Sequence, residues 1–325
     1  MRTLTRWTVL AGWLACTALR GRAEVVLLLE EPYGAFGGMT PTGHAAIYLT
    51  RVCAETPVEL RRCQPGEQGV VISRYHNVDG YDWIAVPPIP YLYAVESAGE
   101  VPDWVDAREV AALRDAYRRA HLESVAPDES DGGTPVGDWV QLVGEAYDRT
   151  IYTYGMETTA EQDDELIREF NSGPNRARFS LLFRNCADFS RRVIDFYYPG
   201  AVHRNFTADL GIMTPKQAAK CVLRYSRKHP GVPLTAFIIP QVPGTIPRSS
   251  AVRGVLESLV KSKRYALPLA PLAVLHPAVG AGMAYAWLRG YGFQPRQIAT
   301  AHGGRPLKPG SVMTALRTQE DAKLP

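Results

Sequence analysis

The chain has 325 residues, 46% of them hydrophobic, and its 36 basic and 33 acidic residues give a formal net charge of +3. This length and composition suit one large buried core, or a core with an appendage, and exclude a chain that is disordered throughout. Because the two kinds of charge are mixed along the sequence, no broad basic face is indicated, and we expect no nucleic-acid partner.

The first 23 residues are typical of an export signal. Positive charge within residues 1–6 precedes an apolar run over residues 7–19, and the small residues Gly21 and Ala23 offer a cleavage point after Ala23. The run is shorter than the roughly 20 residues that a membrane-spanning helix needs, so cleavage is favoured over anchoring. Lipid attachment at Cys16 is a minor alternative, since Trp13 occupies a position where a small aliphatic residue is expected. We therefore expect a bacterial protein exported to the periplasm or the medium.

Export would leave four cysteines in an oxidising compartment: Cys53, Cys63, Cys186 and Cys221. Cys53 and Cys63 flank Pro57 at a spacing suited to two strands of one hairpin, so we predict a disulfide between them. Cys186 is then free to react. The alternative is a structural disulfide between Cys186 and Cys221.

The N-terminal part of the chain predicts an antiparallel sheet. The apolar run inside residues 24–30 predicts a buried strand, residues 42–51 predict a second, and alternating apolar runs and turns over 58–86 predict two or three more. The glycine-rich loop over 30–38 is a weak functional signal by itself.

A largely helical insertion is expected at about 91–175. One amphipathic helix covers residues 106–123 with Asp106 as its cap, and another begins at Thr158 or Thr159 and continues to about Phe170. Aromatic residues over 138–154 favour core packing, with a platform for a sugar, lipid or peptide as the alternative.

No metal and no cofactor are expected. The acids over 161–165 are consecutive, so only alternate ones would converge on a cation, and the positive end of a helix already accounts for them. The chain also lacks the paired-histidine and paired-cysteine spacings of metal-dependent hydrolases.

The segment Arg184-Asn185-Cys186-Ala187-Asp188 predicts the start of a helix that carries a reactive group. Asn185 and Asp188 form something close to a capping box, which places Cys186 at the first helical position. Unpaired N–H groups and the helix dipole favour a thiolate there. The competing interpretation is a small buried cysteine with no chemical role, which this segment alone favours.

His44 lies at the start of the second predicted strand, within Gly43-His44-x-x-Ile47-Tyr48-Leu49. Together with the downstream Asn185-Cys186-x-x-Phe189, this pattern resembles the circularly permuted branch of the papain-like thiol hydrolases. That branch includes lecithin:retinol acyltransferase-like proteins and permuted relatives of NlpC-type cell-wall peptidases. Each half is weak alone, and the pair in this order carries the resemblance.

The resemblance implies that Cys186 is the nucleophile and His44 its general base, with backbone N–H groups near Asn185 holding the oxyanion. Family members carry a second histidine on the adjacent strand to orient the first. Here that neighbourhood holds Glu55, Glu59 and Gln64, of which Glu59 is our candidate for the orienting residue. His76, on the next predicted strand, is a further candidate for which a structural role is favoured.

The C-terminal part begins with a helix from Thr214-Pro215 to about Lys228, followed by a proline-rich, extended stretch over 230–248. Residues 265–288 contain no charged residue. They predict either a membrane segment or an apolar helix or hairpin that packs on the domain or lies at a membrane surface. The tail over 301–325 is expected to be disordered.

We expect an α+β protein with a permuted papain-like fold: a signal peptide (1–23), a domain over 24–240 with the helical insertion, and an extension over 241–325. The expected function is that of an exported cysteine hydrolase or acyltransferase. It would attack an amide or ester through an acyl-thioester, with a cell-wall peptide or a lipid acyl group as substrate. The alternative is a catalytically inactive binding or envelope-scaffolding module of the same fold.

Overall fold

The computed structural model describes residues 23–34, 41–76, 78–261, 263–291, 293–302 and 304–307. The predicted signal peptide up to residue 22, most of the glycine-rich loop and the tail from residue 308 lie outside the described residues. The described part of the chain is a mixed α+β structure, as the sequence predicts.

The centre of the molecule is an antiparallel sheet with the strand order β6-β5-β2-β1-β7-β8. A two-stranded sheet, β3-β4, accompanies it. The strands are β1 Glu24–Glu30, β2 His44–Leu49, β3 Val52–Thr56, β4 Glu59–Arg62, β5 Val70–Ser73, β6 Ile84–Val86, β7 Ile151–Glu157 and β8 Leu234–Ile239. The predicted N-terminal strands are therefore present and adjacent.

Two strands were not predicted. β7 lies inside the insertion that we expected to be largely helical, and β8 lies inside the proline-rich stretch. β7 pairs with β1 along its whole length, so it is central to the sheet. The aromatic residues of β7, which did not indicate a strand, pack in the core, and Tyr152 and Tyr154 are buried. This confirms core packing over an exposed platform.

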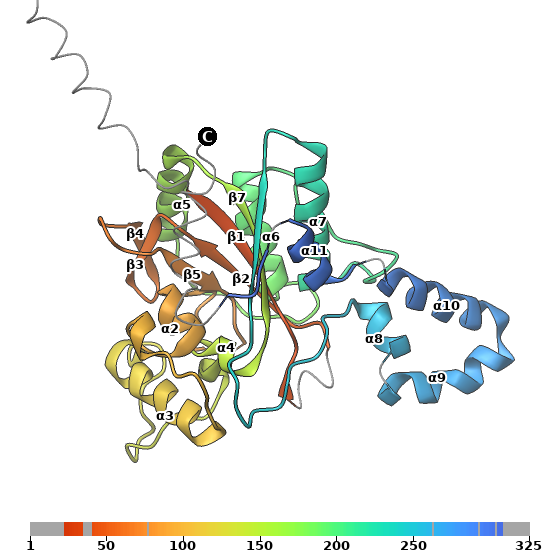
Figure 1. The fold of residues 1–325 in the computed structure, drawn as a ribbon, viewed down its shortest axis with the longest axis horizontal. Helices are drawn as coiled ribbons and strands as arrows, with labels where there is room; N and C mark the ends of the chain where they lie inside the picture. Colours follow the sequence, from red (N-terminus) through yellow and green to blue (C-terminus); the bar gives the residue numbers. More distant parts are fainter. Residues whose placement is uncertain are drawn as a thin grey trace, which may run out of the picture.

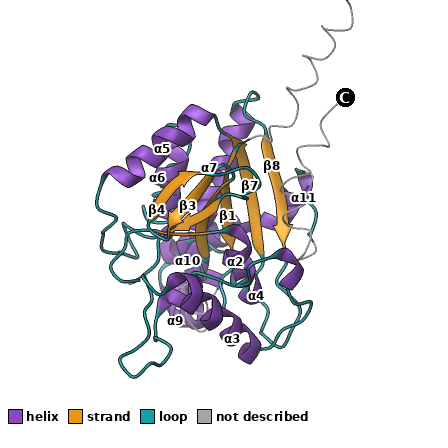
Figure 2. Ribbon diagram, turned by 90° about the vertical axis from the view of Figure 1, so that its left-hand side faces the viewer, coloured by secondary structure: helices purple, strands orange, loops and turns teal. Residues whose placement is uncertain are grey.

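Helices cover both faces of the sheet (Figure 2). They are α2 Pro88–Tyr93, α3 Ala107–Tyr117, α4 Glu145–Asp148, α5 Ala160–Ser172, α6 Cys186–Tyr197, α7 Pro215–Lys228, α8 Val255–Lys261, α9 Lys263–Leu275, α10 Pro277–Tyr291 and α11 Pro295–Ala301. The predicted caps Asp106 and Thr159 each accept a backbone N–H at the start of α3 and α5, and Thr214, where a helix was expected to begin, does the same at α7.

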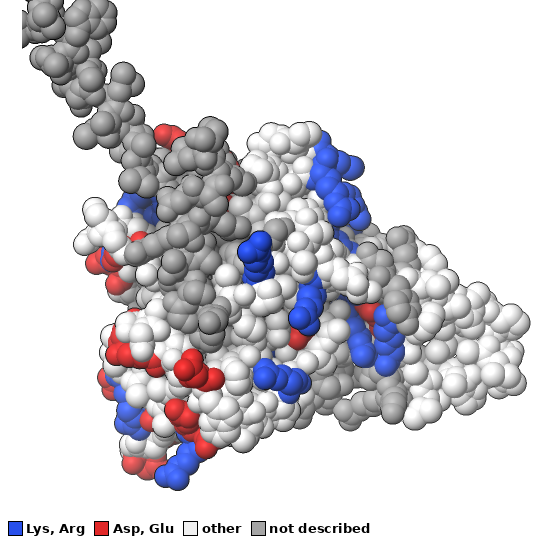
Figure 3. All heavy atoms as spheres, in the orientation of Figure 1, with Lys and Arg blue, Asp and Glu red and all other residues white. Residues whose placement is uncertain are grey.

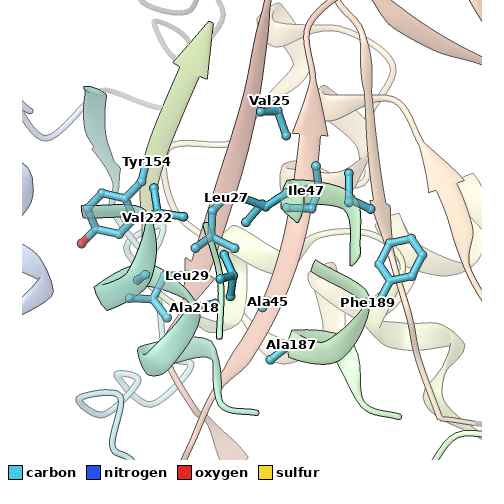
Figure 4. Packing of buried hydrophobic residues seen from close by; sticks show 14 of the residues in the cluster. Val25, Leu27, Leu29, Ala45, Ile47, Tyr154, Ala187, Phe189, Ala218 and Val222 are labelled. Carbon is cyan, nitrogen blue, oxygen red and sulfur yellow. The ribbon is translucent and has the colours of Figure 1, made fainter. Parts of the chain in front are cut away.

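Successive side chains of each strand point to opposite faces of the sheet, so the sheet separates two apolar layers. On one face, Leu27, Ala45 and Ile47 pack against α6 and α7, which contribute Ala187 and Val222 (Figure 4). On the other face, residues of the intervening positions pack against α2, α3 and α4. The sheet is thus buried on both sides, and each β2 residue belongs to one layer or the other.

The apolar segment over 265–288 forms the helices α9 and α10, which project from the rest of the molecule (Figure 1). No helix within the described ranges is long and apolar enough to cross a membrane. The helices are also interrupted in sequence by Pro268 and Pro271 inside α9 and by His276 between the two.

The predicted disulfide between Cys53 and Cys63 is confirmed, and it joins β3 to the residue after β4. Cys186 and Cys221 are both free thiols, so the alternative Cys186–Cys221 bridge is wrong. A disulfide of this kind is compatible with an exported protein in an oxidising environment.

Replacing both Cys53 and Cys63 with serine should lower the free energy of unfolding by about 2–3 kcal/mol, because the bridge closes a short loop in the unfolded chain. Urea unfolding of the double variant and the wild type measures the difference. Unchanged stability would show that the β3-β4 hairpin is held by its other contacts alone.

Candidate active site

Cys186 occupies the first helical position of α6, as predicted from its cap. The Asn185 Oδ1 accepts the N–H of Asp188 at 3.0 Å, and an Asp188 carboxylate oxygen accepts the N–H of Asn185 at 3.3 Å, which completes the capping box. The Asn185 amide also donates to the carbonyl oxygens of Leu181 and Met213. Asn185 thereby fixes the loop before the helix and the loop before α7 around the cysteine.

The Cys186 thiol is buried beneath α6 against β2. Burial raises the pKa of the Cys186 thiol to about 11, and the nearby Glu30 carboxylate adds to this rise. Backbone N–H groups of Ala45 and Ala187 act in the opposite sense, because they hydrogen bond the sulfur and favour its anion. The thiol is therefore protonated at neutral pH, with two N–H groups already directed at it.

His44 begins β2 and directly follows a position that requires glycine. Gly43 has φ +74, and a Cβ atom there would lie 2.1 Å from the Glu30 carbonyl oxygen. The His44 ring is buried and stacks on Tyr75 with 5.2 Å between ring centroids. Burial, with a smaller contribution from the Arg149 charge, lowers the pKa of His44 to about 3, so the imidazole is neutral at neutral pH.

The partner of the His44 ring is Ser73 on the neighbouring strand β5. The Ser73 Oγ lies 2.9 Å from the His44 Nε2, and its hydroxyl donates to the Ala45 carbonyl oxygen at 2.9 Å. Since a hydroxyl has one proton, Ser73 accepts the hydrogen bond from Nε2–H. A neutral imidazole in this tautomer carries its lone pair on Nδ1. The His44 Nδ1 is therefore available as a base.

A buried ionic network lies beside His44 and was not foreseen from the sequence. The Arg149 guanidinium contacts the Glu145 carboxylate at 2.8 Å and the Glu30 carboxylate at 3.2 Å, and Tyr91 donates to Glu30. Burial raises the pKa of both carboxyl groups, although Arg149 acts to lower it. Glu30 pairs with His44 across β1 and β2, so this network sets the electrostatic surroundings of the ring.

The structure brings His44 and Cys186 to neighbouring positions without joining their side chains. The sulfur contacts the backbone of Ala45, the residue next to His44. Cys186 packs in the layer with Ala45 and Ile47, whereas His44 contacts Ser73 and Tyr75, and Tyr75 belongs to the opposite layer. Among the described residues, no hydrogen bond connects the thiol to the imidazole.

The other predicted site residues lie elsewhere. Glu59 is exposed on β4 of the two-stranded sheet, while the ring of His44 is oriented by Ser73. His76 is exposed, and its Nδ1 lies 2.8 Å from an Asp138 carboxylate oxygen. Ser73 was overlooked because a serine in an apolar strand gives little signal, although it occupies the adjacent strand where the family resemblance places an orienting group.

The loop that leads into Cys186 exposes three consecutive large apolar side chains, Leu181, Leu182 and Phe183. Arg204 holds this loop to the helix start, because it donates to the Phe183 carbonyl oxygen and pairs with the Asp188 carboxylate. An apolar surface is therefore fixed directly before the nucleophile candidate.

No family model, no curated protein and no solved structure matches this chain. Within the described ranges, the one group of acidic, cysteine and histidine side chains close enough to share a metal ion is Cys53, Cys63 and Glu67, and the disulfide already occupies both sulfurs. The evidence for a catalytic function therefore comes from the geometry around Cys186 and His44 alone.

The variant Asn185→Ala should lower the free energy of unfolding by about 1–3 kcal/mol, because it removes the helix cap and leaves two carbonyl oxygens without their donor. The variant Asn185→Asp keeps the capping oxygen and loses only the amide donor, so its loss should be smaller. Chemical denaturation of both variants measures this order, and an equal loss in both would contradict the capping role.

The His44 pKa predicts a specific loss of stability in acid. Above pH 6.5 the ring is neutral in both states. As the pH falls from 6.5 towards 3, the unfolded chain binds a proton that the folded protein does not, so stability falls by up to about 1.4 kcal/mol per pH unit. His44→Gln, which retains an N–H donor for Ser73, should remove this component from unfolding curves measured across the window.

The exposed His229→Gln provides the matched control for the loss of one imidazole. An acid dependence in His44→Gln identical to that of the wild type would show that His44 is protonated in the folded protein.

Proposed function

We propose that this protein is a cysteine hydrolase or acyltransferase of the permuted papain-like kind, with Cys186 as nucleophile and His44 as general base. The observation that carries the proposal is the position of the free Cys186 sulfur. It lies at the start of α6, with N–H groups of Ala187 and of Ala45 directed at it, next along the chain to His44. This is the order and packing that the resemblance implies: a histidine-bearing strand followed by a cysteine-bearing helix laid against it.

The charge states exclude a preformed ion pair at rest, and general-base catalysis requires that bound substrate bring the two pKa values closer together. With the thiol pKa raised to about 11 and the His44 pKa lowered to about 3, both groups are neutral at rest. In the proposed step the His44 Nδ1 lone pair takes the thiol proton as sulfur attacks, which requires the ring to turn from Ser73 and Tyr75 towards the sulfur. In the resting protein Ser73 accepts the Nε2–H and so fixes the tautomer with Nδ1 unprotonated.

The bond changes are those of acyl transfer. The Cys186 sulfur adds to the carbonyl carbon, and backbone N–H groups at the helix start stabilise the oxyanion. Collapse of this intermediate breaks the amide or ester bond, and the leaving amine or alcohol takes the proton from His44. Water or another nucleophile then releases the acyl group from the thioester. A cell-wall peptide amide and a lipid acyl group both fit this chemistry.

A second candidate function is a binding or envelope-scaffolding module that retains the fold without the reaction. The observation that favours it is the missing contact between thiol and imidazole, together with a thiol pKa above the ordinary value. Under this candidate Cys186 is a buried packing residue, and the exposed loop over 181–183 binds a partner.

An activated ester distinguishes the two functions. Incubation with p-nitrophenyl butyrate should leave a butyryl group on Cys186, identified by peptide mass spectrometry, and release nitrophenolate in a burst. Cys186→Ser should abolish the thioester adduct. His44→Ala should slow its formation by about 100-fold or more, in the range that positioned general bases contribute.

Cys221→Ser is the matched control, because Cys221 is the other buried free thiol and lies on α7, at 3.7 Å from the His203 Nδ1. It should retain the adduct at Cys186. Acylation at Cys221 alone, or none at either cysteine in the folded protein, would contradict the enzyme and leave the binding module.

A further inference from the structure

The helices α9 and α10 form a projecting arm that exposes apolar side chains along its length, with Leu267 and Leu288 exposed near its base. They pack against one another and against α8, and they meet at His276. Near the base of the arm, Ala286 of α10 is buried. At the tip, Val274 is 84% exposed and Leu275 72% exposed. Folding of the described chain therefore leaves the apolar tip uncovered.

The charges that flank the arm in sequence are mostly basic, and the acidic exception at its base, Glu257 of α8, pairs with Lys216 and Lys261. No Asp or Glu occurs between Glu257 and Glu320, and residues 265–288 contain no charged residue. Basic residues flank the apolar segment, with Lys261, Lys263 and Arg264 before it and Arg289 after it. On the face that Figure 3 shows, the described surface of the arm carries no acidic or basic side chains, and charged side chains appear where it joins the domain.

The arm also changes in chemical character from tip to base. Aliphatic residues form the tip, and the aromatic residues Tyr285 and Trp287 are partly exposed near the base, next to Arg289. Pro268 lies in the first half of α9 and Pro271 just past its middle, so the carbonyl groups four residues before them lie nearer the base. Their rings leave carbonyl groups of α9 without an N–H partner, which is tolerated near water and costly in hydrocarbon. This order is the one that a membrane interface imposes.

We propose that the arm docks on an anionic bilayer surface, with its tip in the acyl region of one leaflet and its aromatic and basic base among the headgroups. The helices have 13 and 15 residues, so each is about 20–22 Å long and too short for a hydrocarbon core of about 30 Å. The arm enters the membrane without crossing it. A second copy of the chain fits less well, because two arms would bring like charges together at their bases.

The docked arm would bring the candidate active site towards the membrane. The N–H groups at the start of α8 bond to Ala208 and Asp209, and the loop over 205–211 exposes Phe206 and Leu210. Arg204 links this loop to the Phe183 loop before Cys186, because it also donates to the Gly211 carbonyl oxygen. This inference is independent of the proposed function, since a binding module with the same arm would dock in the same way.

Vesicle flotation tests the proposal with protein recovered from the exported fraction of expressing cells, so that its N-terminus is the natural one. The wild type should float with vesicles of phosphatidylcholine and phosphatidylglycerol, and less with phosphatidylcholine alone. Rising salt should weaken its binding to the anionic vesicles. Val274→Asp should reduce the partition coefficient by about tenfold or more, because it places a charge at the inserted tip.

Val136→Asp is the matched control, because Val136 is 95% exposed in a loop far along the chain from the arm. It should bind vesicles as the wild type does, and Cys186→Ala should as well. Wild-type protein that fails to float, or that floats equally with Val274→Asp, overturns the proposal. So does a vesicle-free dimer that Val274→Asp dissociates, since the arm would then cover a second copy.

Acylation of Cys186 by p-nitrophenyl butyrate in solution separates this inference from the proposed function. Val274→Asp should retain the reaction if Cys186 is catalytic. A protein that floats without being acylated supports the arm and contradicts the enzyme.

Discussion

The buried Arg149 guanidinium is the interaction on which the surroundings of the candidate site depend. It lies between the Glu30 and Glu145 carboxylates, and all three side chains are almost fully buried. Removal of the arginine would leave two carboxyl groups in an apolar layer without a counter-charge, which is far more costly than the loss of a surface ion pair. Since Glu30 ends β1 and Arg149 precedes β7, the network also fixes the end of the sheet at which His44 lies.

The network at the end of the sheet also affects the pKa of His44. A cation near a buried imidazole opposes a second positive charge, and the Arg149 charge therefore adds to burial in lowering the His44 pKa. The same guanidinium favours the Cys186 thiolate, while Glu30 opposes it. Burial and this fixed set of charges together keep the imidazole neutral, while burial outweighs Arg149 and keeps the thiol protonated.

The sequence predicted the features that depend on residues close together in the chain. The caps of α3, α5 and α6 could be identified because a side chain and an N–H three residues later determine them. The Cys53–Cys63 bridge followed from hairpin spacing. β7 and β8 could not be identified, because pairing partners far away in the sequence define them, Glu24 for Glu157 and Ile151 for Ile239 among them, and the aromatic residues of β7 suit a helix or a strand. Ser73 and Arg149 were missed for the same reason, since only the fold brings them to His44.

A protonated, buried cysteine has a clear advantage in the environment that the Cys53–Cys63 disulfide suggests. Thiolate is the form that exchanges with disulfides and is oxidised, so an exposed low-pKa cysteine outside the cytosol is readily lost. At the α6 N-terminus, burial overcomes the favourable N–H groups and holds the thiol neutral at rest. A substrate carbonyl delivered from the apolar loop over 181–183 would remove the need for a standing thiolate, because proton transfer and attack then occur together. Under the proposed function, the features that make Cys186 inert in the resting protein are therefore those that preserve it for reaction.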